Sequence, residues 1–276
     1  MVVVDDGSTD PETQRALGLL ERGGVRVIRQ ANTGVSAARV AGVAAARAPY
    51  VHSLDSDDML APGVLSRMAD MLDGDPSLDA VWGNVEAFGE QEFVEVTWDC
   101  FDPWRITYVN EIPAAALIRR SSLLASESWQ ATGYEDWGLW MTAAERGWRG
   151  AKINEVTLRY RIQPVTRRLD LEYTMDTSNR ADLRQRHRRL YEGRRANRRR
   201  STSRAGVKLT WPVIDALPLI SPLQKHRLLR FSRHLFEPQM RTGSSKLRIL
   251  RDIRWRLLPR AAENAYGAER SPPRRR

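Results

Sequence analysis

The chain has 276 residues, enough for one large domain or for a domain with an appendage, and a formal net charge of +10. Its single cysteine, Cys100, excludes an intramolecular disulfide and a zinc site built from several cysteines, so a reducing compartment is expected. No run of 18 apolar residues is present, and the sequence predicts no transmembrane helix.

The charge is divided unevenly along the chain. Residues 1–180 carry 18 Lys and Arg against 27 Asp and Glu, whereas residues 181–276 carry 26 against 7. This asymmetry predicts an acidic globular domain followed by a segment that meets an anionic partner.

Apolar runs alternate with helical patterns over the first quarter of the chain. Strands are expected at 1–5, 25–28 and 50–54, and helices at 11–22, 34–46 and 62–73. Strands that alternate with helices in this way predict a parallel sheet covered by helices.

The pattern changes after Pro76. Further strands are expected at 81–88, 93–97, 112–118 and 153–162, and helices at 133–146 and 176–191. Residues 194–204 are rich in Arg, Ser and Asn, which is typical of a solvated linker or flexible arm. Beyond them, 225–236 and 246–258 place apolar residues at helical spacing between basic ones, and the last ten residues are expected to be disordered.

An acidic turn follows the strand expected at 50–54. Asp55, Asp57 and Asp58 lie within four residues, where they repel one another. In open α/β sheets, ligands bind beyond the carboxyl ends of the strands. Since Mg²⁺ takes one or two carboxylates together with substrate phosphates, a metal–diphosphate site is the functional hypothesis. Acidic capping of the next helix is the structural alternative.

Three other motifs bear on this turn. The first, VVVDDGSTD at 2–10, brings Asp5 and Asp6 to a strand end. The second, NTGVSAAR at 32–39, is a helix start whose free N–H groups suit a phosphate, with Arg39 in reach. The third, GYEDW at 133–137, places two carboxylates between aromatic residues, a setting that can shield a general base from water.

Together with the LDSDD of the acidic turn, these motifs resemble the family 2 glycosyltransferases, which are inverting enzymes with the GT-A fold. The resemblance covers about residues 1–165 and follows the family's order and approximate spacing. It implies an α/β fold with a GT-A-like, mostly parallel sheet flanked by helices, to which the chain adds a basic, largely helical C-terminal extension.

The resemblance also assigns roles by position. Asp5 and Asp6 match the acidic pair that contacts the nucleobase of the donor, and Arg39 matches an arginine near the nucleotide. Asp55 and Asp57 match the DxD motif, with Asp57 as the direct ligand of a divalent metal, Mg²⁺ or Mn²⁺, and Asp55 assisting it.

Asp136 matches the catalytic base of the family. The implied reaction is a single displacement, in which Asp136 deprotonates an acceptor hydroxyl that attacks the anomeric carbon of a nucleotide sugar. Two departures stand out. The family begins with an earlier strand and helix, so a misplaced start or a truncated chain is expected. Gln163 stands near a position where some relatives carry a metal-ligating His.

Each candidate also has an ordinary structural explanation. Asp5 and Asp6 could form an Asx-turn, and Arg39 could lie on the surface of an Ala-rich helix. Either carboxylate of the pair at 135–136 could cap a helix. Three tryptophans are expected in the core rather than as platforms for sugars: Trp137, Trp140 and Trp148.

These observations predict a glycosyltransferase domain at 1–165, a helix and Arg-rich linker at 166–204, a basic amphipathic extension at 205–260 and a disordered tail at 261–276. The expected partners are a nucleotide-sugar donor and a saccharide or lipid-linked acceptor, in cell-surface polysaccharide or glycolipid synthesis.

A cytoplasmic location is expected. The extension either docks on the anionic inner face of the plasma membrane, with Trp211 and Trp255 among its anchors, or packs on the catalytic domain. The alternatives are an inactive glycosyltransferase-like fragment and a nucleic-acid-binding protein that acts through 184–204. That stretch lacks the interleaved aromatic residues that stack bases.

Overall fold

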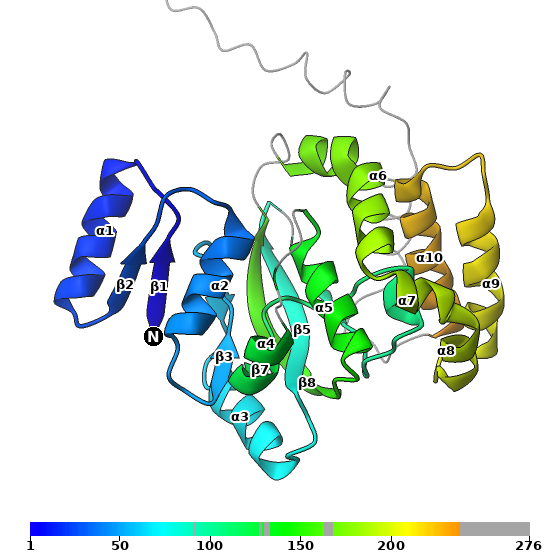
Figure 1. Cartoon of the computed structure of the whole chain (residues 1–276), viewed down its shortest axis with the longest axis horizontal. Helices are drawn as coiled ribbons and strands as arrows, with labels where there is room; N and C mark the ends of the chain where they lie inside the picture. The colour runs from blue at the N-terminus through cyan, green and yellow to red at the C-terminus, as the bar shows by residue number, and fades with distance from the viewer. Residues whose placement is uncertain (91, 127–128, 130–132, 163–167, 238–276) are drawn as a thin grey trace, which may run out of the picture.

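The computed structural model describes residues 1–90, 92–126, 129, 133–162 and 168–237 (Figure 1). The structure contains two sheets and a group of helices formed by the C-terminal part of the chain. The N-terminal sheet and the C-terminal helices lie at opposite ends of the long axis, with the larger sheet between them (Figure 1).

The N-terminal sheet consists of β1 (Val2–Asp5) and β2 (Arg26–Arg29), which pair in parallel. Helix α1 (Pro11–Arg22) connects them and has the predicted bounds. Asp10 caps its start by accepting a 2.8 Å hydrogen bond from the Thr13 amide, Pro11 fills its first turn, and Gly23 ends it. Helix α2 (Val35–Ala45) follows β2 and lies beside β1 (Figure 1).

The larger sheet has the strand order β3–β7–β5–β8–β4, with β6 paired to β5. Its strands are β3 (Tyr50–His52), β4 (Met59–Leu60), β5 (Ala80–Gly89), β6 (Phe93–Glu95), β7 (Leu117–Arg119) and β8 (Gly150–Ile162). Helix α3 (Val64–Gly74) packs against β5 and β7.

The mixed α/β class is confirmed, but the sheet is not the mostly parallel one that was predicted. Only β5 and β8 pair in parallel among the described strands of the larger sheet, and its other pairs are antiparallel. The strand expected at 112–118 shortens to β7. Pro113 has no N–H to donate to a ladder, which is consistent with the shortening.

Tryptophans from distant segments form the centre of the core. Trp82, Trp98, Trp104 and Trp140 are each at most 1% exposed, and Trp137 is also buried, so the core assignment of Trp137 and Trp140 is confirmed. Trp148 is half-buried and packs against the same cluster. Helix α4 (Arg120–Ser126), helix α5 (Glu135–Glu145) and the 3₁₀ turn η1 (Arg105–Thr107) lie in this part of the chain.

The Arg-rich stretch is helical, which corrects the linker predicted there. Helices α6 (Arg168–Arg186), α7 (Arg188–Glu192) and α8 (Arg194–Arg200) follow one another. Arg194 donates to the Thr107 carbonyl at 2.6 Å, pairs with Asp215 at 2.8 Å and stacks over Tyr108 at 4.1 Å. Composition could not reveal these partners, because they come from other parts of the chain.

The next two helices, α9 (Ala205–Ala216) and α10 (Pro222–Phe236), pack against each other and against the tryptophan core. Trp211 is fully buried, stacks on Trp104 at 5.7 Å and donates its indole N–H to Ser232 at 2.9 Å. The expectation that Trp211 anchors the chain in a membrane is therefore wrong. Gln163, Trp255, the pattern at 246–258 and the tail at 261–276 lie outside the described residues.

None of the helices among the described residues is long and apolar enough to span a bilayer.

Candidate functional site

Asp5 and Asp6 end β1 and hold the neighbouring turns together. Asp5 is 6% exposed, and its carboxylate accepts hydrogen bonds from the Ser8 amide at 2.9 Å and from the Gln14 side chain at 3.3 Å. These hydrogen bonds, with those of Ser8 first, lower the pKa of Asp5. Ser8 lies three residues after Asp5, whereas an Asx-turn closes on the residue two positions on, so this bond differs from the Asx-turn given as the structural alternative.

Asp6 connects β1 to the start of α2. Its carboxylate accepts from the Thr33 amide at 2.9 Å and from the Gly34 amide at 2.8 Å, and these bonds lower its pKa. Gly34 is the N-cap of α2 and has no side chain to accept from the helix. A carboxylate here complements the positive end of the helix dipole. The start of α2, which was predicted from the sequence to suit a phosphate, thus has the Asp6 carboxylate beside it.

Arg39, on α2, joins three segments of the site. Its guanidinium donates to Asp136 Oδ1 at 2.8 Å, to Asp55 Oδ1 at 3.0 Å and to Glu135 Oε1 at 3.4 Å. The Arg39 side chain is only 9% exposed, and its guanidinium lies 4.6 Å from the ring centre of Trp129. A single buried cation therefore holds three carboxylates that would otherwise repel one another.

The two acidic residues of this group on α5 lie in its first turn. Tyr134, the N-cap, has a left-handed backbone and makes no side-chain cap hydrogen bond. Carboxylates in a first helical turn are favoured by the helix dipole. Glu135 and Asp136 consequently have a helix-stabilising position and a place in the site at the same time.

The pKa of Asp136 is raised from 3.8 to about 6. Burial among protein groups is the main cause, and the charges of Glu135 and Asp55 add to it, while Arg39 acts in the opposite direction. Part of the carboxyl remains open to solvent, since the Asp136 side chain is 39% exposed. A carboxylate of this pKa is ionised at neutral pH and more basic than an ordinary aspartate, which suits a general base.

The acidic turn after β3 is tied to the end of β8. Arg161 donates its amide N–H to Asp58 Oδ1 at 2.9 Å and its Nε to the Asp57 carbonyl at 3.0 Å. The Asp58 amide closes the turn on the Asp55 carbonyl at 3.1 Å. Asp55 reaches Arg39, and Asp57 is half-buried in the same turn.

With the side chains that the structure describes, this turn would hold a divalent metal together with oxygen atoms of a bound ligand. Within the part of the chain that the structure describes, His, Cys, Asp and Glu side chains form no group of three suited to a metal ion. The carboxylates of Asp55 and Asp57 would supply one or two hard oxygen ligands. That donor set fits Mg²⁺ or Mn²⁺ when phosphate oxygens and water complete the coordination.

Two residues near this site were not found from the sequence. Trp129 is buried beneath Arg39 and has a positive φ of 71°, yet no local pattern marks it. His52 ends β3, three residues before Asp55, and burial lowers the pKa of its imidazole to about 4, so the ring is neutral at physiological pH. Trp129 and His52 differ from other tryptophans and histidines of the chain only in their tertiary surroundings, which the sequence does not show.

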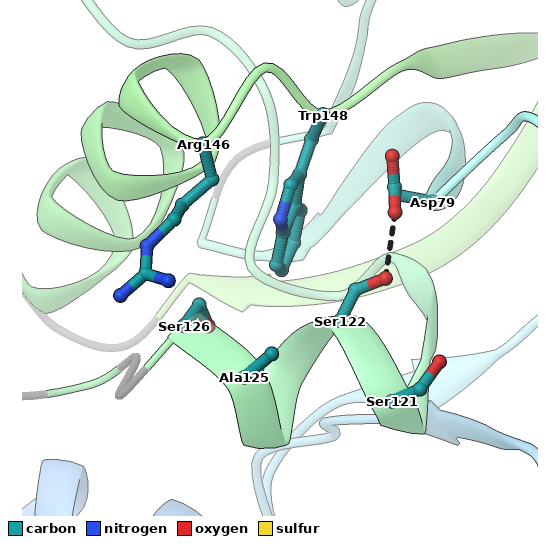
Figure 2. Close-up of a pocket in the computed structure, with 7 residues that line it drawn as sticks. All are labelled: Asp79, Ser121, Ser122, Ala125, Ser126, Arg146 and Trp148. Atoms are coloured by element: carbon teal, nitrogen blue, oxygen red, sulfur yellow. Dashed lines mark hydrogen bonds between the residues drawn. The ribbon is translucent and has the colours of Figure 1, made fainter.

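A separate polar cavity lies at the opposite end of α5 from Asp136. It has a volume of about 360 Å³ and is lined by Asp79, Ser121, Ser122, Ala125, Ser126, Arg146 and Trp148 (Figure 2). The Ser122 hydroxyl donates to Asp79 at 2.6 Å (Figure 2). The other Asp79 oxygen accepts from the Arg149 amide at 2.9 Å. Because none of the predicted site residues lines it, this cavity is distinct from the Arg39 cluster.

Comparison with known proteins connects this geometry to a family. Residues 1–123 match the family model described as "Glycosyl transferase family 2". This matched stretch is the family 2 segment of the chain. The family 2 segment contains all the predicted site residues except the acidic pair on α5, and Arg39 brings that pair to the segment.

A curated relative of the family 2 segment is the uncharacterized glycosyltransferase EpsJ of Bacillus subtilis (strain 168), which is 35% identical over 71 residues. The match covers 25% of this chain and 21% of EpsJ, so the chain matches only about a fifth of that relative's length.

Two solved structures of S. aureus TarS also resemble the chain. TarS 1–349 gives a TM-score of 0.49 with 17% identity, covering 84% of this chain and 77% of that one. The longer TarS structure gives a TM-score of 0.48 with 18% identity, covering 84% and 46%.

Proposed function

We propose that the chain is a glycosyltransferase that moves a sugar from a nucleotide-sugar donor to an acceptor hydroxyl. Membership of residues 1–123 in family 2 supports sugar transfer as the class of reaction. The observation that carries the proposal is the Arg39 cluster, in which a carboxylate with the pKa of a general base lies beside the acidic turn.

In the proposed reaction, Asp136 accepts the proton of the acceptor hydroxyl. The hydroxyl oxygen forms a bond to the anomeric carbon while the bond from that carbon to the diphosphate breaks, and the nucleoside diphosphate leaves with the electron pair. One displacement of this kind inverts the anomeric configuration. A positioned general base contributes about 10²- to 10⁴-fold to such a rate.

Asp57 and Asp55 would hold a divalent metal in this proposal, with Asp57 as the direct ligand. A bound Mg²⁺ or Mn²⁺ supplies Lewis-acid stabilisation of the departing diphosphate. Arg39 is suited to the same end of the donor, because a guanidinium can hydrogen-bond phosphate oxygens in place of the carboxylates it now holds.

Asp5 and Asp6 are proposed for the nucleobase end of the donor. Asp6 contacts Gly34 at the start of α2, and Arg39 lies five residues further along that helix, about 7.5 Å at 1.5 Å per residue. A nucleotide that runs along this end of α2 would reach from Asp6 to the acidic turn. Since Asp5 is buried whereas Asp6 is half-buried, we assign direct contact with the base to Asp6 and the support of its turn to Asp5.

The acceptor is proposed to be a saccharide or a lipid-linked sugar, in the synthesis of cell-surface polysaccharide or glycolipid. Nucleic-acid binding through 184–204 has less support, because Arg194, in that stretch, is engaged with Thr107 and Asp215 inside the protein.

The test is a transfer assay with a panel of nucleotide sugars and Mn²⁺, comparing the unaltered chain with Asp136→Asn. We expect turnover of at least one donor and its loss in the variant, with donor affinity kept, because the base acts in the transition state. Asp70→Asn, at an exposed position of α3, is the matched control and should keep full activity. Donor turnover that Asp136→Asn leaves unchanged would refute the assignment. An unaltered chain that binds no nucleotide sugar would favour the inactive fragment.

A further inference from the structure

Helices α9 and α10 form a hairpin with one buried face and one apolar outer face. Val207 and Trp211 of α9 and Leu229 of α10 are at most 2% exposed and point into the core. On the outer face, Leu209 is 64% and Val213 62% exposed. More than half of each of these two apolar side chains is therefore left uncovered by the residues that the structure describes.

The outer face continues across both helices. A groove of about 390 Å³ runs between them, and its lining is almost wholly apolar: Leu209, Thr210, Val213, Ile214, Leu228, Phe231, Ser232, Leu235 and Phe236. Phe231 is 44% and Leu235 62% exposed. The loop between the helices adds another exposed apolar side chain, Leu219, at 95% exposure.

This apolar face belongs to the most basic part of the described structure. Residues 181–236 carry 15 Lys and Arg against 3 Asp and Glu, a balance of +12. Arg200 and Arg204 are exposed where α8 leads into α9, and Arg204, the N-cap of α9, is five residues before Leu209. In Figure 1, α7, α8, α9 and α10 form one end of the molecule.

Charge selects among the partners that could cover this face. A second copy would bring another strongly basic surface against the first, and the like charges would repel. An anionic bilayer instead offers acyl chains to the leucines and phenylalanine and negative head groups to the arginines. The combination of an exposed apolar stripe with surrounding cations is typical of helices that lie in a membrane interface.

We propose that the α9–α10 face binds the surface of an anionic lipid bilayer, with Leu209, Val213, Phe231 and Leu235 inserted at the level of the acyl chains. Arg200 and Arg204 contact the lipid head groups. This binding does not depend on sugar transfer, and it would hold for an inactive chain as well.

The experiment measures co-sedimentation of the full chain with vesicles of phosphatidylcholine, alone or mixed with phosphatidylglycerol. The test variant is Leu209→Gln/Phe231→Gln. The matched control is Leu19→Gln/Leu124→Gln, which changes leucines of similar exposure, 63% and 49%, on α1 and α4. We expect binding to the mixed vesicles, a fall of about tenfold or more in the test variant, and no change in the control. Circular dichroism and thermal melts check that both variants fold.

A charge variant, Arg200→Gln/Arg204→Gln, tests the second half of the proposal. Each arginine near an anionic leaflet contributes about fivefold to binding, so the double variant should lose affinity for mixed vesicles only. Failure of the unaltered chain to bind mixed vesicles would overturn the proposal. Binding that Leu209→Gln/Phe231→Gln leaves unchanged would also overturn it and would fit coverage of the face by residues 238–276. A third result would overturn the proposal. If the unaltered chain self-associates but does not bind vesicles, and Leu209→Gln/Phe231→Gln abolishes the self-association, then a second copy of the chain is the partner of this face.

Discussion

Arg39 and Asp136 are 97 positions apart in the sequence, and their Nη1 and Oδ1 atoms lie 2.8 Å apart. This contact connects the family 2 segment to a helix beyond it. It also places an arginine beside the proposed base, where its charge limits the rise in the pKa of Asp136.

The pH dependence of transfer should reflect Asp136. Because the pKa of Asp136 is about 6, kcat/KM should decrease as the pH drops below about 6, with the slope expected for the protonation of a single group. A pH–rate profile measures this. An acid limb near 4 would mean that a different or unperturbed carboxyl acts as the base.

The same pKa affects stability. The folded chain holds the Asp136 proton more tightly than the unfolded chain, whose pKa is near 3.8, so this group's contribution is fully present below about pH 4 and is lost as the pH rises through 6. Asp136→Asn should remove this decline. Denaturant unfolding of both proteins at pH 4 and pH 8 measures it, and a parallel decline in the two would contradict the assignment.

Removal of Arg39 should change both the base and donor binding. The Arg39→Gln variant removes the positive charge that limits the increase in the pKa of Asp136, so this pKa should become higher. The acid limb of the kcat/KM profile should therefore move to higher pH. Nucleoside diphosphate affinity should fall as well. Arg39→Lys keeps the charge and should restore the acid limb more than the affinity, because lysine cannot make the forked contacts. An unmoved limb in Arg39→Gln would show that the contact has no electrostatic role.

Asp57→Asn should abolish metal-dependent binding of nucleoside diphosphate and leave the fold intact. The variant removes a charge from a turn of like charges, so its melting temperature should not fall substantially. Calorimetric titration with and without Mn²⁺ measures the binding, and Asp70→Asn again serves as the control. If Asp57→Asn retains Mn²⁺-dependent binding of nucleoside diphosphate, Asp57 is not a required ligand of the metal.

The contact between α10 and the rest of the core should be costly to break. Glu111 and Arg233 form an ion pair with side chains that are 1% and 2% exposed. Glu111→Gln leaves a buried cation without its carboxylate and should lower the free energy of unfolding by about 3–5 kcal/mol. Glu192→Gln breaks the exposed pair with Arg188 and should cost about 1 kcal/mol or less. Equal losses in the two variants, measured by denaturant unfolding, would contradict this account.

The sequence by itself determined much of the local structure. Asp10, Pro11 and Gly23 define α1 because caps and breakers act within a few residues of the helix ends. The acidic turn and the start of α5 were located for the same reason, since each follows from a short run of residues.

The tertiary structure decided which of these local features meet. Arg39 has its partners 16 and 97 positions away, Arg194 is held by residues 21 and 87 positions away, and Trp211 is buried rather than free to anchor. A local pattern records that a side chain is basic or apolar, but not which distant group neutralises or covers it. Which distant group lies next to a side chain depends on how the sheets and helices pack. This packing is determined by many individually weak contacts along the whole chain.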